Sequence, residues 1–222
     1  MKLLIKFPTR GRKEKFFNVL DKYYDNLDDV DNVRFVITCD NDDDTMNTKE
    51  VRALFDDYKN LEYHYGDSKS KIEAVNNDIN DLDFDILLLA SDDMVPQTKG
   101  YDTIIKDNMG KYYPDKDGVL WFYDGYRRDL NTLCVMGVKY YKRFNYIYHP
   151  DYNSFYCDNE FTIVANRLKR QQYIDTCIIK HLHPDITKEL HDSYDETYLK
   201  NNKGGDDTIF AQRMNKNFDL KL

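Results

Sequence analysis

Blocks of apolar residues alternate with polar loops and amphipathic stretches over the first ninety residues. Short apolar runs predict strands, and apolar residues at three- and four-residue spacing predict helices. The expected strands are 3–7, 33–38, 61–65 and 84–90, and the expected helices between them are 16–27, 51–58 and 72–82. The run 84–90 is nearly all apolar, which is typical of a strand buried on both faces. Alternating strands and helices indicate a mostly parallel sheet, whose ligands bind at the carboxyl ends of the strands.

The pattern is less regular in the second half of the chain. A helix over 101–109 and a strand over 119–123 are followed by a Tyr-rich region without clear periodicity up to residue 156. Further on, the expected elements are a helix over 159–170, a strand over 173–181 and a helix over 206–217. We find no linker, internal repeat or low-complexity tract. The pattern therefore predicts one α/β domain over residues 1–222.

The composition supports a folded domain. The chain has 222 residues, of which 41% are hydrophobic, and its 19 Tyr and 12 Phe argue against disorder. The longest apolar run, 86–90, is far shorter than the roughly 20 residues that span a membrane. The four Cys are scattered without CxxC spacing, so we expect reduced thiols and a cytoplasmic location, in a bacterium or a virus-infected cell.

The charge narrows the chemistry. The net charge is −8, and Asp outnumbers Glu by 33 to 7. Asp favours turns, helix caps and metal-facing loops because its short side chain bonds nearby backbone and reaches cations. An acidic chain is not expected to bind nucleic acid non-specifically. Any anionic ligand must be attracted by local cations rather than by the net charge.

Polar clusters follow the four N-terminal strands. They consist of Thr9, Arg10 and Arg12 after the first strand, Asp40 and Asp42 after the second, Ser68 and Lys71 after the third, and Asp92 and Asp93 after the fourth. Arg and Lys suit phosphate oxygens, an Asp after the second strand suits a base or ribose hydroxyl, and adjacent Asp suit a divalent metal. Taken singly, each cluster is typical of a solvated, capped loop. Together they predict a site for a nucleoside diphosphate.

Two segments resemble the metal-dependent GT-A glycosyltransferases of the family-2-like kind, and the resemblance extends over essentially the whole chain. Residues 5–12 resemble the first strand and loop of that family, and residues 84–94 are similar to the strand that carries its DxD metal motif. The resemblance implies that Asp92, helped by Asp93, binds Mn²⁺ or Mg²⁺. Ala90 stands where the first Asp of the motif is usual, so the ribose contact falls to Asp40 or Asp42. The expected donor-binding residues are Pro8, Thr9, Arg10, Arg12, Asp40, Asp42, Ser68, Lys71, Ser91 and Asp92.

A second resemblance concerns catalysis. The segment 157–161 is similar to the family's ED-type segment, whose Asp deprotonates the acceptor hydroxyl. This implies that Asp158 is the general base, with Glu160 as the alternative. Helix capping is the structural explanation for an Asp at this place. The resemblance divides the domain into a nucleotide-binding half, 1–95, and an acceptor-binding and catalytic half, 96–222.

Two histidines and two late aspartates complete the candidates. His181 and His183 are two residues apart and so share one face of the expected strand. Related transferases have an H-x-H-P segment, so either His completes the metal site, or neither does. Asp206 and Asp207 open the last helix, where the helix dipole favours acids in the first turn. A role for this pair in the site is the alternative.

We expect a metal-dependent, inverting transfer of a sugar from a UDP- or GDP-sugar to an acceptor hydroxyl. The alternatives are a nucleotidyltransferase and a non-catalytic nucleotide- or glycan-binding module. The Tyr-rich region 124–156 falls where such enzymes receive the acceptor, and its aromatic rings suit sugar faces or bases. The acceptor is left open between a glycan, a lipid-linked glycan, a protein and a modified base in viral DNA. Nucleic acid enters only as an acceptor.

Overall fold

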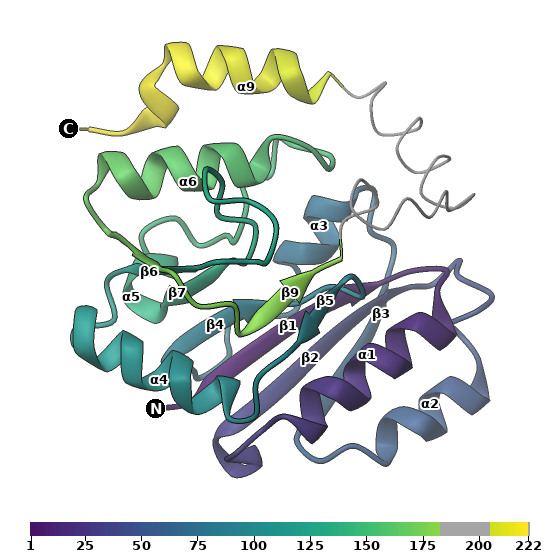
Figure 1. The fold of residues 1–222 in the computed structure, drawn as a ribbon. Helices are drawn as coiled ribbons and strands as arrows, with labels where there is room; N and C mark the ends of the chain where they lie inside the picture. The colour runs from purple at the N-terminus through teal and green to yellow at the C-terminus, as the bar shows by residue number, and fades with distance from the viewer. Residues whose placement is uncertain (183–204, 222) are drawn as a thin grey trace.

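The computed structural model describes residues 1–182 and 205–221 as an α/β structure (Figure 1). Its central sheet has the strand order β3-β2-β1-β4-β7-β6-β8. The strands are β1 (Leu3–Thr9), β2 (Val33–Asp40), β3 (Leu61–Gly66), β4 (Ile86–Leu89), β6 (Val119–Phe122), β7 (Val135–Gly137) and β8 (Gln171–Ile174). Only β7 pairs antiparallel with its neighbours in this sheet. The expected α/β fold with a mostly parallel sheet is confirmed.

Helices cover both faces of this sheet (Figure 1). They are α1 (Lys13–Asp25), α2 (Lys49–Asp56), α3 (Lys71–Asn76), α4 (Tyr101–Tyr112), α5 (Val138–Tyr141), α6 (Cys157–Arg167) and α9 (Asp206–Asn215), with 3₁₀ turns η1 (Val30–Asn32) and η2 (Asn217–Asp219). No helix in the described part of the chain is long and apolar enough to cross a membrane.

The side chains of β1 point alternately to the two faces of the sheet and divide the core into two parts. Leu3, Ile5 and Phe7 pack with α1, α2 and α4 on one face of the sheet, and Leu4 packs with α3, α5 and α6 on the other. Successive side chains of a strand point to opposite faces, so a central strand covered on both sides must be apolar at nearly every position. The continuous apolar runs of the sequence are the result of this double burial.

The structure differs from the expected elements where the sequence pattern extends over only a few residues. The helix expected over 72–82 ends at Asn76, because Asn77 is extended and Asp78 has a φ of 65°. The strand expected over 173–181 is two strands, β8 in the central sheet and β9 (Ile179–His181), which pairs with β5 (Met94–Pro96). Residues 135–141, expected to be irregular, form β7 and α5. Strands of three residues carry too few positions to show a period, so tertiary pairing decides them.

A buried lysine interrupts the apolar core beneath α3. Lys6 of β1 is fully buried, donates a hydrogen bond to Thr38 Oγ1 and lies 3.9 Å from a carboxylate oxygen of Asp78. Thr38 donates in turn to Asp78. Burial lowers the pKa of the Lys6 ammonium to about 8, although the charge of Asp78 opposes this change. These contacts fix the end of α3 against β1 and β2.

Replacing Lys6 tests this assignment through pH. Its pKa is lower in the folded chain than in the unfolded one, so the unfolded chain binds more protons between pH about 8 and about 10.5. Over that range we expect the free energy of unfolding of the wild type to rise by up to about 3 kcal/mol relative to Lys6→Met. Urea denaturation of both chains at several pH values measures it. A difference that does not change with pH would contradict the lowered pKa.

Candidate active site

The carboxyl ends of β1, β2, β3 and β4 meet at one edge of the sheet. Thr9 pairs with Cys39, and Asp40 pairs with Gly66. The Ala90 amide donates to the carbonyl of Lys6 at 2.8 Å, which places the loop after β4 beside the loop after β1. Because all four strands are parallel, the four polar clusters named from the sequence lie along this edge.

The loops after β1 and β2 are tied together by charge. The Arg10 guanidinium donates to Asp40 at 2.7 Å and to Asp42 at 3.0 Å. Asp43, which sequence reasoning did not single out, is buried and accepts a hydrogen bond from the Gly11 amide at 2.6 Å. Nothing in the run of three Asp residues marks the middle one as the anchor. Arg10 is therefore engaged with carboxylates in this structure.

Three buried polar atoms at this edge have no hydrogen-bond partner among the described residues. They are Thr9 Oγ1, Asp40 Oδ1 and Ser68 Oγ, one from each of the loops or strand ends after β1, β2 and β3. A buried hydroxyl or carboxylate oxygen without a partner costs about 1–3 kcal/mol. Their convergence at the ends of three adjacent strands marks a place where a polar ligand or ordered water would satisfy them. Pro8, also expected here, is half-buried in β1.

Asp92 lies among cations from two other loops. Its carboxylate accepts an ion pair from Arg12 Nε at 2.9 Å and lies 3.9 Å from Lys15 Nζ. Burial raises the pKa of the Asp92 carboxyl above its ordinary value, while the charges of Arg12, Lys15 and Lys71 oppose the rise. The structure thus brings Arg12 and Lys15 to Asp92, and Lys15 was not among the expected residues.

The neighbouring Asp93 faces a different set of groups. Ser91 donates to Asp93, and His181 lies with Nε2 at 3.5 Å from Asp93 and Nδ1 at 3.7 Å from Asp124. Burial alone would lower the pKa of His181, but the two carboxylates outweigh it and raise the pKa to about 9. In this structure His181 thus lies between the carboxylates of Asp93 and Asp124.

These donors fit a divalent metal only in part. Among residues 1–182 and 205–221, no three His, Cys, Asp or Glu side chains lie close enough together to hold a metal ion. A carboxylate oxygen is the kind of donor that Mg²⁺ and Mn²⁺ prefer, but Asp92 is paired with Arg12 in this structure. The second expected histidine, His183, lies outside the described residues.

Asp124 was not singled out, although it stands at the carboxyl end of β6. It is buried and accepts hydrogen bonds from the amides of Tyr126 and Arg127 at 2.8 and 2.7 Å and from Thr132 Oγ1 at 2.6 Å. These bonds fix the loop 124–132 beside α6. The Asp-Gly pair after a predicted strand was the available signal.

Asp158 lies in the first turn of α6 and is half-buried. It is not the N-cap, which is Tyr156, but its Oδ1 accepts a hydrogen bond from the Asn159 amide in the same turn at 2.9 Å. Burial raises the pKa of the Asp158 carboxyl above its ordinary value, and the charges of Lys71 and Arg127 oppose this change. The positive charge of Lys71 thus opposes the rise of the pKa of both Asp92 and Asp158.

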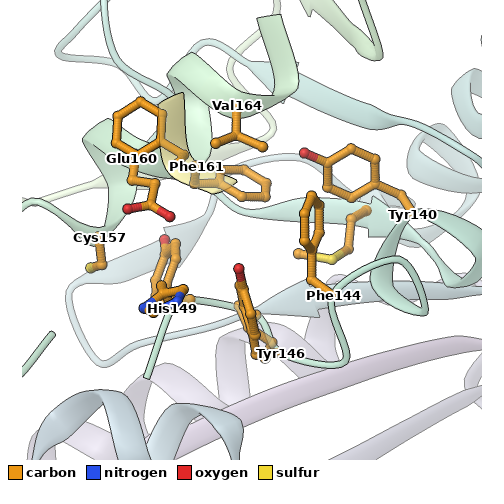
Figure 2. A pocket seen from close by; sticks show the side chains of 12 residues that line it. Tyr140, Phe144, Tyr146, His149, Cys157, Glu160, Phe161 and Val164 are labelled. Atoms are coloured by element: carbon orange, nitrogen blue, oxygen red, sulfur yellow. The ribbon is translucent and has the colours of Figure 1, made fainter. Parts of the chain in front are cut away.

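Glu160, the alternative base, faces away from this edge. It is buried, and its two oxygens pair with Arg213 Nε and Nη2 at 2.7 and 2.8 Å. Tyr152 donates a further bond at 2.7 Å. Figure 2 shows the Glu160 carboxylate beside Tyr146 and His149, in a cavity of about 20 Å³ that has room for about one water molecule. These contacts assign Glu160 to the packing of α6 against α9, so it does not replace Asp158 as candidate base.

Removing the partner of Glu160 tests this structural role. Arg213→Ala leaves a carboxylate buried without its counter-ion, and we expect the free energy of unfolding to fall by about 3–5 kcal/mol. The matched control is the double change Glu160→Leu with Arg213→Leu, which removes both charges and should cost far less. Chemical denaturation measures both. Equal losses in the two variants would contradict the ion pair as the cause.

The Tyr-rich region divides into core and surface. Its buried members are Tyr140, Tyr141, Tyr148 and Tyr152. Tyr126 and Tyr156 are 41% and 40% exposed; Tyr126 lies in the loop 124–132, and Tyr156 is the N-cap of α6. Arg128 pairs with Asp175, and Arg143 pairs with Asp117, so the charges of these two arginines are neutralised locally.

Comparison with known proteins gives matches in structure but not in sequence. No family model and no curated protein match the chain. TarS from S. aureus (residues 1–349) superposes with a TM-score of 0.65 at 15% identity, over 100% of this chain and 73% of TarS. The mannosyltransferase PcManGT from Pyrobaculum calidifontis, in complex with GDP-Man and Mn²⁺, gives 0.62 at 12% identity, over 79% and 55%. The fold is that of the GT-A glycosyltransferases.

A further match has a different activity in its name. The 4-diphosphocytidyl-2C-methyl-D-erythritol synthase of Anaerococcus prevotii superposes with a TM-score of 0.55 at 10% identity, over 83% of this chain and 92% of that protein.

TarS has also been determined in complex with UDP-GlcNAc, where the match covers 58% of that chain. This chain thus spans little more than half the length of these two nucleotide-sugar complexes. The likeness concerns the fold.

Proposed function

We propose that this protein transfers a sugar from a nucleotide-diphosphate sugar to an acceptor hydroxyl, with inversion at the anomeric carbon. One observation carries the proposal: Arg12 after β1 pairs with Asp92 after β4 at 2.9 Å, and the start of α3, which carries Lys71, is bonded to the loop before α6, which carries Asp158. Cations for a diphosphate and a carboxylate suited to a base are thus gathered at the edge where sheets of this kind bind ligands. The structural neighbours that bind GDP-Man or UDP-GlcNAc support it.

The donor lies across the ends of the first four strands. Its nucleoside end satisfies the unpartnered oxygens of Thr9, Asp40 and Ser68. Its diphosphate lies toward Arg12 and Lys71, because these side chains supply positive charge that a chain of net charge −8 otherwise lacks. Arg10 holds the loop after β2 in place through Asp40 and Asp42.

Asp92 is the metal ligand in the described part of the chain, and Mn²⁺ or Mg²⁺ bound to it would stabilise the negative charge of the leaving diphosphate. His183 is the further residue that would hold the ion with Asp92. Asp93 contributes indirectly, since it is paired with His181.

Asp158 accepts the proton in the transfer step. The acceptor oxygen forms a bond to the anomeric carbon as its proton passes to the Asp158 carboxylate. The bond between that carbon and the diphosphate oxygen breaks, and its electron pair leaves with the nucleotide. The raised pKa of Asp158 makes it a stronger base than an exposed carboxylate. A single displacement of the diphosphate by the acceptor oxygen inverts the configuration of the anomeric carbon.

Removing each carboxylate separates binding from chemistry. We expect the wild type to release nucleotide from UDP-GlcNAc or GDP-mannose in the presence of Mn²⁺. Asp158→Asn should lower the turnover rate by about 100-fold or more while donor affinity changes little, because the base acts only in the chemical step. Asp92→Asn should weaken metal-dependent donor binding. Calorimetry and a nucleotide-release assay measure these effects.

Three other outcomes distinguish the alternatives. If no donor binds and none is turned over, the transferase proposal fails. Donor affinity without turnover, unchanged by Asp158→Asn, indicates a binding module. Release of pyrophosphate from a nucleoside triphosphate indicates a nucleotidyltransferase. The structural match to the 4-diphosphocytidyl-2C-methyl-D-erythritol synthase is the reason to test this class.

The nucleoside end of the site has its own test. Asp40→Asn should weaken UDP or GDP binding by about tenfold or more, because a charge-assisted hydrogen bond contributes about 1.5–3 kcal/mol. Asp44→Asn is the matched control: this exposed residue of the same loop loses the same charge, and we expect no change beyond about twofold. Equal weakening in both variants would indicate a general charge effect instead of a contact with the donor.

A further inference from the structure

One face of α9 contacts both α6, which carries the candidate base Asp158, and the loop 153–155 that leads into α6. Asp206, Phe210 and Arg213 are spaced i, i+4 and i+7, so they form a single stripe along α9. Their partners follow one another along the chain at 153–155, Tyr156 and Glu160. Figure 1 shows α9 alongside α6.

Asp206 binds the loop that leads into α6. It is 3% exposed, and its carboxylate accepts hydrogen bonds from the backbone amides of Asn153, Ser154 and Phe155 at 2.9, 2.9 and 2.8 Å. Gly205 is the N-cap of α9. A first-turn acid that only complements the helix dipole needs no burial and no bonds to another segment. The helix-dipole explanation is therefore insufficient for Asp206.

The turn that follows the loop bound by Asp206 is strained. Tyr156 has a φ of 61°, which is a rare conformation for a bulky side chain and costs on the order of 1 kcal/mol or more. Its ring stacks on Phe210 of α9 at a centroid distance of 5.3 Å. Asp206 binds the amide of Phe155, the residue before Tyr156. Arg213 binds Glu160, four residues after Tyr156. The strained turn is held by α9 on both sides.

This arrangement determines where Asp158 points. Two residues correspond to about 200° around a helix, so Asp158 lies on the face of α6 opposite Glu160 and away from α9. The same loop is fixed to α3, because the Asn153 carbonyl accepts a hydrogen bond from the Ile72 amide at 3.3 Å, next to Lys71. The loop held by Asp206 thus connects the element that carries Lys71 with the element that carries Asp158.

We infer that Asp206 is a positioning residue for sugar transfer: it fixes the loop 153–155 and so holds Asp158 in register with Lys71. The inference rests on the proposed function and adds a residue remote from the donor. Loss of the three amide bonds would let the turn at Tyr156 relax and displace the Asp158 carboxylate. A displacement of about 1 Å at a catalytic group costs on the order of 100-fold in rate.

The test compares Asp206 with its neighbour. Asp206→Asn should lower the rate of nucleotide release from UDP-GlcNAc or GDP-mannose with Mn²⁺ by about tenfold or more. Donor affinity should stay within about twofold, since β1–β4 build the donor site. Asp207→Asn is the matched control: it removes an exposed acid from the same helix turn, and both quantities should stay unchanged. Asp206→Glu keeps the charge but moves the carboxylate, so positioning predicts a loss of rate here too.

A readout independent of activity accompanies these rates. Amide hydrogen exchange at 153–155 should accelerate in Asp206→Asn and not in Asp207→Asn, because only Asp206 binds those amides. Unchanged exchange would overturn the inference. So would an active wild type with equal rates in Asp206→Asn and Asp207→Asn, or a fall in donor affinity as large as the fall in rate. A wild type that turns over no donor shows instead that the proposed function fails.

Discussion

The parallel pairing of β1 with β2 and β4 is the constraint on which the candidate site depends. Parallel strands need a crossover between them, and the crossovers that contain α1, α2 and α3 bury both faces of the sheet. The carboxyl ends of the strands consequently meet at one edge, and each loop there emerges from a rigid strand. Arg12 and Asp92, 80 positions apart, are within 2.9 Å for this reason.

The aspartates of this acidic chain have two distinct uses. Asp43, Asp102, Asp124 and Asp206 are buried, and each accepts hydrogen bonds from backbone amides of a loop. The short Asp side chain reaches such amides with little loss of side-chain freedom, whereas the longer Glu side chain loses more. Asp92 and Asp158, by contrast, are held near cations and accept few protein hydrogen bonds. Only the second kind is suited to bind or react with a ligand.

Long, periodic segments were predictable from the sequence, and short ones were not. The strands β1 to β4 and the helices α1, α2 and α6 follow from apolar runs and helical spacing, because core burial imposes those patterns. The three-residue strands β5, β7 and β9 have no such pattern, and their pairing across the chain defines them. The loop clusters were identified from their place after strands. Asp43 and Lys15 were missed because their partners Gly11 and Asp92 are distant in the sequence.

The sequence by itself determined the parallel sheet, the edge where the polar loops converge and, through their two-residue spacing, that Asp158 and Glu160 lie on different sides of one helix. It could not determine which of the two carboxylates packs against α9. In the structure Arg213 of α9, 53 positions further along the chain, binds Glu160. The tertiary structure likewise turned Asp206 from a helix-end acid into an anchor for 153–155. Both outcomes depend on contacts between distant segments, which local patterns do not contain.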